Sequence, residues 1–233
     1  MPDRSKIEWT DATWNPVTGC WPISDGCNNC YAKRIYERFN DGPFSQIIYH
    51  WDRFDIPRNW KKPRRIFLGS MTDLFQKDVQ DGYRKIIEGV IADCPQHTFM
   101  VLTKRADNMR VYFTGNLPYR NLWLGVTVEG PETLWRVRAL RKIKSATRFI
   151  SFEPLLADVG KVNLEGISWV IVGSESGPRR RPCDIEWIRS LRDQCVAAGV
   201  PIFIKQANIN GKLVKTPPID GKVWAETPEA PDA

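Results

Sequence analysis

Three cysteines lie within eleven positions near the N-terminus of the chain. The stretch GCWPISDGCNNCYAKRIYERF at residues 19–39 puts six residues between Cys20 and Cys27 and two between Cys27 and Cys30. Packing thiols are usually scattered through a core, so three in one short segment suggest a shared ligand. The proline, aspartate and glycine between them are typical of a loop. These thiols are therefore candidate metal ligands, with ordinary loop cysteines as the alternative.

The rest of the chain indicates a reducing compartment. The opening residues MPDRSKIEWTD contain no apolar run of the kind that a signal peptide has. No stretch approaches the roughly 18 apolar residues of a membrane span. We therefore expect a soluble, cytoplasmic protein without a membrane partner. In that compartment the six cysteines stay reduced and form no disulfide framework.

A structural zinc site is one explanation of the cysteines. The pair Cys27-x2-Cys30 is a suitable half-site, but tetrahedral zinc needs four ligands. The two histidines of the chain, His50 and His97, do not stand at knuckle-like positions. The remaining cysteines are isolated from one another, at positions 94, 183 and 195. Zinc therefore lacks a clear fourth ligand and is kept as the alternative.

An iron–sulfur cluster explains the number of cysteines better. A [4Fe-4S] cubane has four irons, so three protein thiolates leave one iron open to a small molecule. Ligand thiols must be deprotonated. A helix expected to begin near Cys30 would turn its positive N-terminal end toward the cluster, and Lys33 and Arg34 add positive charge. We therefore predict that Cys20, Cys27 and Cys30 hold a [4Fe-4S] cluster.

A repeated pattern along the chain indicates the elements that would position these thiols. Short apolar runs that end in polar residues alternate with helical stretches, which predicts a parallel sheet with right-handed crossovers. Near-continuous apolar runs fit strands that are buried on both faces. The expected strands lie at 11–18, 64–73, 97–105, 121–129, 147–154, 167–176 and 200–206. The expected helices lie at about 79–93, 131–143 and 184–198.

About six to seven parallel strands predict an α/β protein with an incomplete (β/α) barrel. We assign the barrel to residues 1–207, with the iron–sulfur loop at 19–31. Residues 208–233 form a C-terminal extension, in which residues 212–214 and 222–224 are expected to pair as a hairpin. The last few residues are expected to be disordered.

Polar residues end several of the expected strands, and chemistry in such barrels takes place at the C-terminal ends of the strands. These residues are Asp73, Lys104, Arg105, Glu129, Glu153, Glu175, Lys205 and Gln206. The cysteine loop follows the first expected strand, so it belongs to the same end of the barrel. A single charged residue of this kind often only marks where a strand leaves the core. For the whole set, converging with three cysteines, we favour a functional site.

The formal net charge of +7 fits either simple solubility or a polyanionic partner such as DNA or RNA. The segment GPRRRPCD at 177–184 places Arg179, Arg180 and Arg181 in a loop bounded by glycine and proline. We expect these arginines to contact phosphate groups, with a solvated loop as the alternative. Cys183 beside them is a candidate catalytic hydrogen-atom donor, with an inert thiol as the alternative.

Several motifs resemble known proteins. Three cysteines after the first strand of a partial barrel resemble the radical S-adenosylmethionine superfamily, although the usual spacing there is three and two. The Cys30-Tyr31-Ala32 sequence and GSMTDLFQ at 69–76 resemble spore photoproduct lyase. Over nearly the whole chain, a phage and prophage family of uncharacterised three-cysteine-motif proteins is similar. The shared motifs are WTDATWNPVTGC, GCNNCYA, GSMTDLF, SFEPLL, VGSESG and FIKQ.

The resemblance implies a radical S-adenosylmethionine-like enzyme. An electron donor would reduce the cluster, and cleavage of S-adenosylmethionine would give a 5′-deoxyadenosyl radical that abstracts hydrogen from the substrate. Ser70 and Asp73 would contact the methionyl end of the cofactor, and Glu129 and Glu175 would line the pocket. Charge and the likeness to photoproduct lyase suggest a nucleic-acid base as the substrate, for modification or repair. The alternative is a non-catalytic phage accessory or nucleic-acid-binding protein with a structural cluster or zinc.

Overall fold

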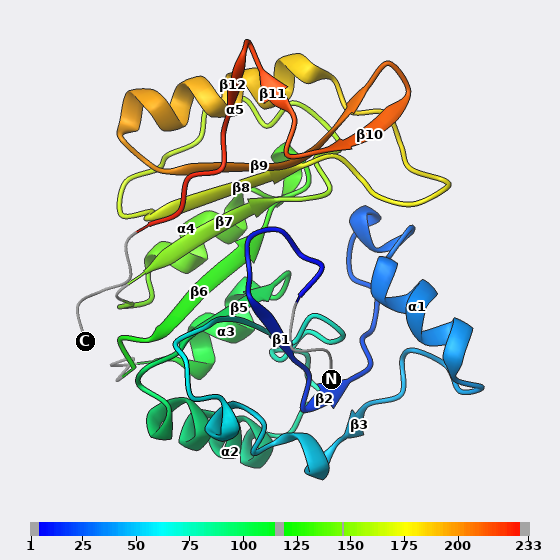
Figure 1. The fold of residues 1–233 in the computed structure, drawn as a ribbon, viewed down its shortest axis with the longest axis vertical. Helices are drawn as coiled ribbons and strands as arrows, with labels where there is room; N and C mark the ends of the chain where they lie inside the picture. Colours follow the sequence, from blue (N-terminus) through cyan, green and yellow to red (C-terminus); the bar gives the residue numbers. More distant parts are fainter. Residues whose placement is uncertain (1–4, 115–118, 146, 229–233) are drawn as a thin grey trace.

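An eight-stranded sheet, curled into a half-barrel, forms the centre of the molecule (Figure 1). The computed structural model describes residues 5–114, 119–145 and 147–228. In sheet order the strands are β1 (Ala12–Trp14), β4 (Arg65–Leu68), β5 (Thr98–Thr103), β6 (Leu122–Thr127), β7 (Arg148–Phe152), β8 (Trp169–Gly173), β9 (Ile202–Ile209) and β10 (Lys212–Lys215). Every neighbouring pair from β1 to β9 is parallel, and β10 is antiparallel to β9. This confirms the prediction of an incomplete barrel.

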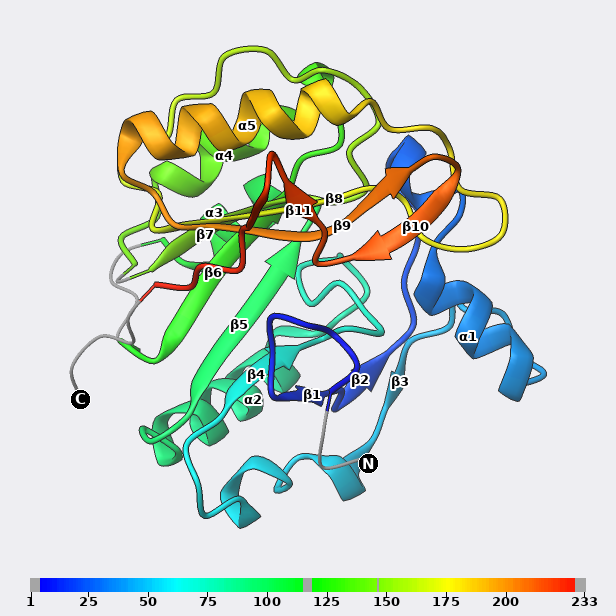
Figure 2. The same cartoon turned by 45° about the horizontal axis from the view of Figure 1, so that its top comes forward.

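Helices pack on the outer face of this sheet, apart from α1, which stands at its edge (Figures 1 and 2). The α-helices are α1 (Tyr31–Phe39), α2 (Asp81–Asp93), α3 (Ala106–Tyr112), α4 (Trp135–Arg141) and α5 (Ile185–Ala198). The expected helix at 184–198 is confirmed: Asp184 caps its N-terminus by accepting from the Glu186 N–H, and Gly199 ends it with a φ of 66°. The expected helix at 131–143 is instead a 3₁₀ turn, η4 (Pro131–Thr133), followed by α4. The short helix α3 was not expected.

The expected first strand at 11–18 is divided in two. β1 pairs with β4 in the main sheet, whereas β2 (Val17–Thr18) pairs with β3 (Ile48–Tyr49) outside it. Pro16 lies between the two strands and has no N–H to donate to a ladder. The remaining short elements are three 3₁₀ turns, η1 (Asp25–Cys27), η2 (Trp51–Arg53) and η3 (Pro57–Asn59).

Two hydrophobic clusters pack on opposite faces of the sheet, because successive side chains of a strand alternate between its faces. On β4, Ile66 and Leu68 belong to the large cluster beneath the helices, and Phe67 belongs to the inner one. The inner cluster is mostly aromatic: Trp9, Phe67, Met100, Trp123, Phe149, Trp169, Ile171 and Phe203. Gly125 makes room for it, since a Cβ atom there would overlap the ring of Phe149. Large rings thus fill the inside of the half-barrel.

The C-terminal extension does not pair as predicted. β10 is joined to β9 by an Asn210–Gly211 turn, and β11 (Pro218–Ile219) pairs with β12 (Lys222–Val223) around Asp220–Gly221. All four turn residues have positive φ values, between 50° and 80°, as two-residue hairpins prefer. The predicted pairing of 212–214 with 222–224 is therefore wrong. β9 also runs two residues past the expected boundary at 207, to Ile209. The end that was expected to be disordered lies outside the described residues.

Within the described ranges, no helix has both the length and the apolar character needed to cross a bilayer.

Candidate functional site

The three cysteines of the N-terminal loop line one cavity at the C-terminal ends of the strands. The cavity has a volume of about 400 Å³, which is within the usual range for small-molecule sites. Each of the three thiols is free and partly exposed. We call residues 19–31 the cysteine loop. It runs from the end of β2, through the turn η1, to the first residue of α1.

Side chains from the segment after β4 hold the loop on both sides of Cys20. The buried Gln76 amide donates to the Gly19 carbonyl at 2.8 Å and accepts from the Trp21 N–H at 3.2 Å. The Thr72 hydroxyl donates to the same Gly19 carbonyl at 2.7 Å. Cys20 is thereby fixed between two anchored neighbours.

Glu129, at the end of β6, holds the turn that carries Cys27. Its carboxylate accepts from the Ser24 hydroxyl at 2.7 Å, from Arg136 at 3.2 Å and from the Lys104 ammonium. The side chain is almost completely buried and is not part of the cavity wall. Glu129 therefore supports the cysteine loop from outside the cavity, whereas the sequence analysis predicted that it lines the pocket. Its predicted contact with the cofactor stays a prediction.

Glu175, after β8, holds the third cysteine in the same way. One carboxylate oxygen accepts from the Asn29 amide at 2.9 Å and from the Arg181 N–H at 2.8 Å, and the other accepts from the Arg181 guanidinium at 2.5 Å. Arg181 also donates to the Asp25 carbonyl at 3.0 Å. The loop after β8 therefore lies directly against the cysteine loop. Cys30 follows Asn29 and is the N-cap of α1.

Two cations from the end of β5 lie beside the thiols. Arg105 approaches the Cys20 sulfur at 4.0 Å and donates to the Trp21 carbonyl at 2.7 Å. Burial and the nearby Asp73 carboxylate nevertheless raise the pKa of the Cys20 thiol to about 12. Burial also disfavours the Cys27 thiolate, but Lys104 and backbone N–H groups outweigh it and lower the pKa of that thiol. Cys27 is accordingly the more easily ionised of these two thiols.

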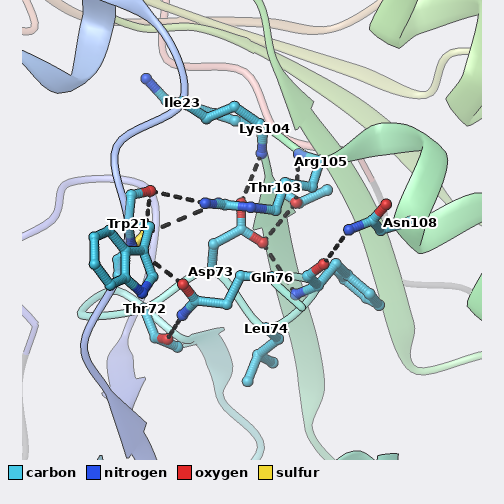
Figure 3. Close-up of polar contacts among 12 residues, drawn as sticks. Trp21, Ile23, Thr72, Asp73, Leu74, Gln76, Thr103, Lys104, Arg105 and Asn108 are labelled. Atoms are coloured by element: carbon cyan, nitrogen blue, oxygen red, sulfur yellow. Dashed lines mark hydrogen bonds and ion pairs between the residues drawn. The ribbon is translucent and has the colours of Figure 1, made fainter. Parts of the chain in front are cut away.

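The Asp73 carboxylate binds Arg105 and the backbone of Lys104 beside the thiols (Figure 3). One carboxylate oxygen accepts from the Phe75 N–H at 3.0 Å and the Thr103 hydroxyl at 2.7 Å. The other accepts from the Lys104 N–H at 3.1 Å and Arg105 at 2.9 Å. Four protein donors therefore surround the carboxylate, although Asp73 is part of the cavity wall. Its role in binding the methionyl group stays a prediction.

The other predicted site residues are placed as follows. Ser70 lines the cavity and exchanges hydrogen bonds with Asn15 at 2.9 and 3.2 Å. Arg179 is exposed, and Arg180 donates to the carbonyls of Gly177 and Gly211. Cys183 is buried in the large core cluster and is not part of the cavity wall. The catalytic role predicted for Cys183 stays a prediction.

Several residues that hold the loop were not found from the sequence. Ser24, Asn29 and Gln76 are ordinary polar residues, and their partners are distant in the chain. Gln76 could have been identified as a candidate, since it is the last residue of the motif GSMTDLFQ. Lys104 was predicted as one of the strand-end residues. Its position near both Cys27 and Glu129 depends on how the ends of β5 and β6 meet the cysteine loop, which is a tertiary feature.

The [4Fe-4S] cluster stays a prediction, and the donor set can be compared with what such a cluster needs. Among the described residues, no group of three or more His, Cys, Asp or Glu side chains could hold one metal ion. The thiolates of a cubane bind different irons, so they surround a volume and do not converge on a point. Three thiols around one cavity, with two cations beside them, are compatible with that arrangement.

Comparison with known proteins identifies the family. A search of curated proteins found no match, and neither did a search of solved structures. A family model described as "Protein of unknown function (DUF5131)" matches residues 4–228, which is nearly the whole chain. The chain therefore belongs to this family of proteins of unknown function.

Proposed function

We propose that the protein is an iron–sulfur enzyme of the radical S-adenosylmethionine type. The observation that carries this proposal is that Cys20, Cys27 and Cys30 line one cavity at the strand ends of a half-barrel. The loop is anchored close to each cysteine by a residue that follows a different strand: Gln76 bonds to Gly19, Glu129 to Ser24 and Glu175 to Asn29. Rigid support of this kind is what a metal site needs from its surroundings.

The residues of the site would have the following roles. The three thiolates would bind a [4Fe-4S] cluster, which when bound and reduced supplies the electron that cleaves S-adenosylmethionine. Lys104 and Arg105 would offset the negative charge of the thiolates. Ser70, on the cavity wall, would contact the methionyl end. An electron-donor protein is a required partner.

A nucleic-acid base is the proposed substrate. The net charge of +7 supports a polyanionic partner, and the exposed Arg179 lies in the loop that packs against the cysteine loop. A base would have to leave its stack to reach a cavity at the end of a barrel, as in other enzymes that act on bases. Arg181 is engaged by Glu175 and would contribute less to phosphate binding than Arg179.

Spectroscopy of the anaerobically reconstituted protein tests the proposal. We expect a brown protein with a broad absorption at about 400 nm, as is usual for iron–sulfur proteins. The spectrum of the reduced cluster should change when S-adenosylmethionine is added. A spectrum that S-adenosylmethionine leaves unchanged would reject the radical chemistry, and a colourless zinc protein would support a structural metal site.

A further inference from the structure

Glu153 and Lys205 form an ion pair on the wall of the same cavity. The Lys205 ammonium donates to one oxygen of Glu153 at 2.5 Å, and the Gln206 amide approaches the same oxygen at 3.4 Å. The two side chains are only 17% and 19% exposed. Within the described ranges, the second oxygen of Glu153 has no hydrogen-bond partner and the ammonium has no second acceptor. One carboxylate oxygen and two N–H donors of the ammonium thus remain side by side.

The fold makes room for this pair. Glu153 follows β7 and Lys205 lies on β9, so the pair spans the intervening strand β8. Gly173 ends β8 beneath it, and a Cβ atom at that position would lie 3.3 Å from the Glu153 side chain and 3.4 Å from that of Gln206. A partly dehydrated ion pair is a weak source of stability, because desolvation offsets much of the attraction. Both side chains line the cavity, so their remaining donor and acceptor positions are accessible to a ligand there.

The surroundings of the pair suggest the shape of that ligand. Trp9, Leu102 and Leu213 supply apolar parts of the same cavity wall. A flat, largely apolar molecule with a donor and an acceptor on one edge would match both features. Nucleobases have this character, and enzymes that act on bases bind them by edge hydrogen bonds and by contacts with their faces.

We infer that Glu153 and Lys205 bind the hydrogen-bonding edge of a nucleobase in the cavity. Lys205 donates to a ring nitrogen or carbonyl oxygen of the base, and the unpaired oxygen of Glu153 accepts from an amino group or ring N–H. The inference deepens the proposed function, on which the choice of a nucleobase rests. The base has two possible sources, the nucleic-acid substrate and the adenine of S-adenosylmethionine.

Nucleoside titration of the full-length protein tests the inference. Adenosine, cytidine, guanosine and thymidine are titrated by calorimetry into metal-free protein and into reconstituted protein. We expect at least one nucleoside to bind, and Glu153→Gln and Lys205→Met each to weaken that binding by about 10- to 100-fold. The matched control is Lys222→Met, which removes a lysine from an exposed ion pair with Glu226 outside the cavity and should leave affinity unchanged.

A ligand-side control keeps the test valid if a variant misfolds. An analogue of the bound nucleoside whose edge donor is methylated should lose affinity for the unchanged protein. If S-adenosylmethionine competes with the nucleoside, the base is the cofactor's adenine; if both bind together, it belongs to the substrate. No binding of any nucleoside to the wild type, or equal affinities in wild type and both variants, overturns the inference. Nucleoside binding by a protein that forms no cluster would reject the proposed function and leave this inference intact.

Discussion

Gly26 lies directly against the carboxylate of Glu129. A Cβ atom at position 26 would overlap that carboxylate and would lie 2.8 Å from the Lys104 ammonium. The turn that carries Cys27 is therefore seated on an ion pair formed by the ends of β5 and β6. A residue with a side chain does not fit there unless the pair moves.

Gly26→Ala is expected to displace this turn. Overpacking of a filled site costs about 1–3 kcal/mol, so the free energy of unfolding should fall by that amount. Iron content after reconstitution should fall with it, because Cys27 is the next residue. The control is Gly89→Ala, within α2, where the added Cβ would have no atom within 4 Å apart from its chain neighbours and the backbone of its own helix; there stability should be unchanged or rise by up to about 1 kcal/mol. Wild-type stability and iron content in Gly26→Ala would show that the contact is unimportant.

Glu175→Gln is expected to loosen the end of the loop near Cys30. Burial opposes ionisation of Glu175, but hydrogen bonds from Arg181 and Asn29 outweigh it and lower the carboxyl pKa below its usual 4.5. The ionised group therefore stabilises the fold above pH 4.5, and this contribution is lost as the pH falls through the folded-state pKa. Near neutral pH we expect a loss of about 1–3 kcal/mol.

Chemical denaturation of wild type and Glu175→Gln across the acidic range measures this effect. The difference in unfolding free energy should shrink as the pH falls below 4.5. Glu186→Gln is a suitable control, because that carboxylate is exposed on α5. A difference that stays constant down to the most acidic pH would mean that the Glu175 charge does not stabilise the loop.

Arg179 and Arg181 should behave differently in nucleic-acid binding. Arg179 is exposed, whereas Arg181 is paired with Glu175. Arg179→Ala should lower the slope of log affinity against log salt by about 0.9 for duplex DNA, without changing stability. Arg181→Ala should destabilise the protein and lower its iron content. If the wild type does not bind DNA or RNA even at low salt, the positive charge has another purpose.

Asp73→Asn separates cofactor binding from support of the loop. The amide N–H₂ group would face donors in place of an acceptor, so we expect a loss of about 1–3 kcal/mol in stability. If Asp73 also binds the methionyl ammonium, affinity for S-adenosylmethionine should fall by about 10- to 100-fold at equal cluster content. Titration followed by the cluster spectrum measures this. Equal affinities at equal cluster content would leave Asp73 with the structural role alone.

The sheet could be predicted from the sequence because its strands are apolar along their length. β6 and β8 are buried at every position, which gives a strong local signal. The helix α3 has only seven residues, and a pattern that short is weak. The Asn210–Gly211 and Asp220–Gly221 pairs are recognised hairpin signals, and either could have corrected the predicted pairing of the C-terminal extension.

The site could be predicted only in part. Cysteine spacing and strand ends indicated which side chains would meet, since both are local features of the chain. The contacts between them depend on tertiary structure: Ser24 and Glu129 are 105 residues apart, and Asn29 and Glu175 are 146 residues apart. Sequence alone therefore could not show that Glu129 and Glu175 hold the cysteine loop.

Iron and acid-labile sulfide content after anaerobic reconstitution tests the central claim most directly. We predict about four irons and four sulfides per chain in the wild type and in Cys94→Ala, whose thiol is buried in the core. Cys20→Ala, Cys27→Ala and Cys30→Ala should each lose the cluster. Iron content that survives all three single changes, or a wild-type protein that takes up zinc without sulfide, would contradict the account.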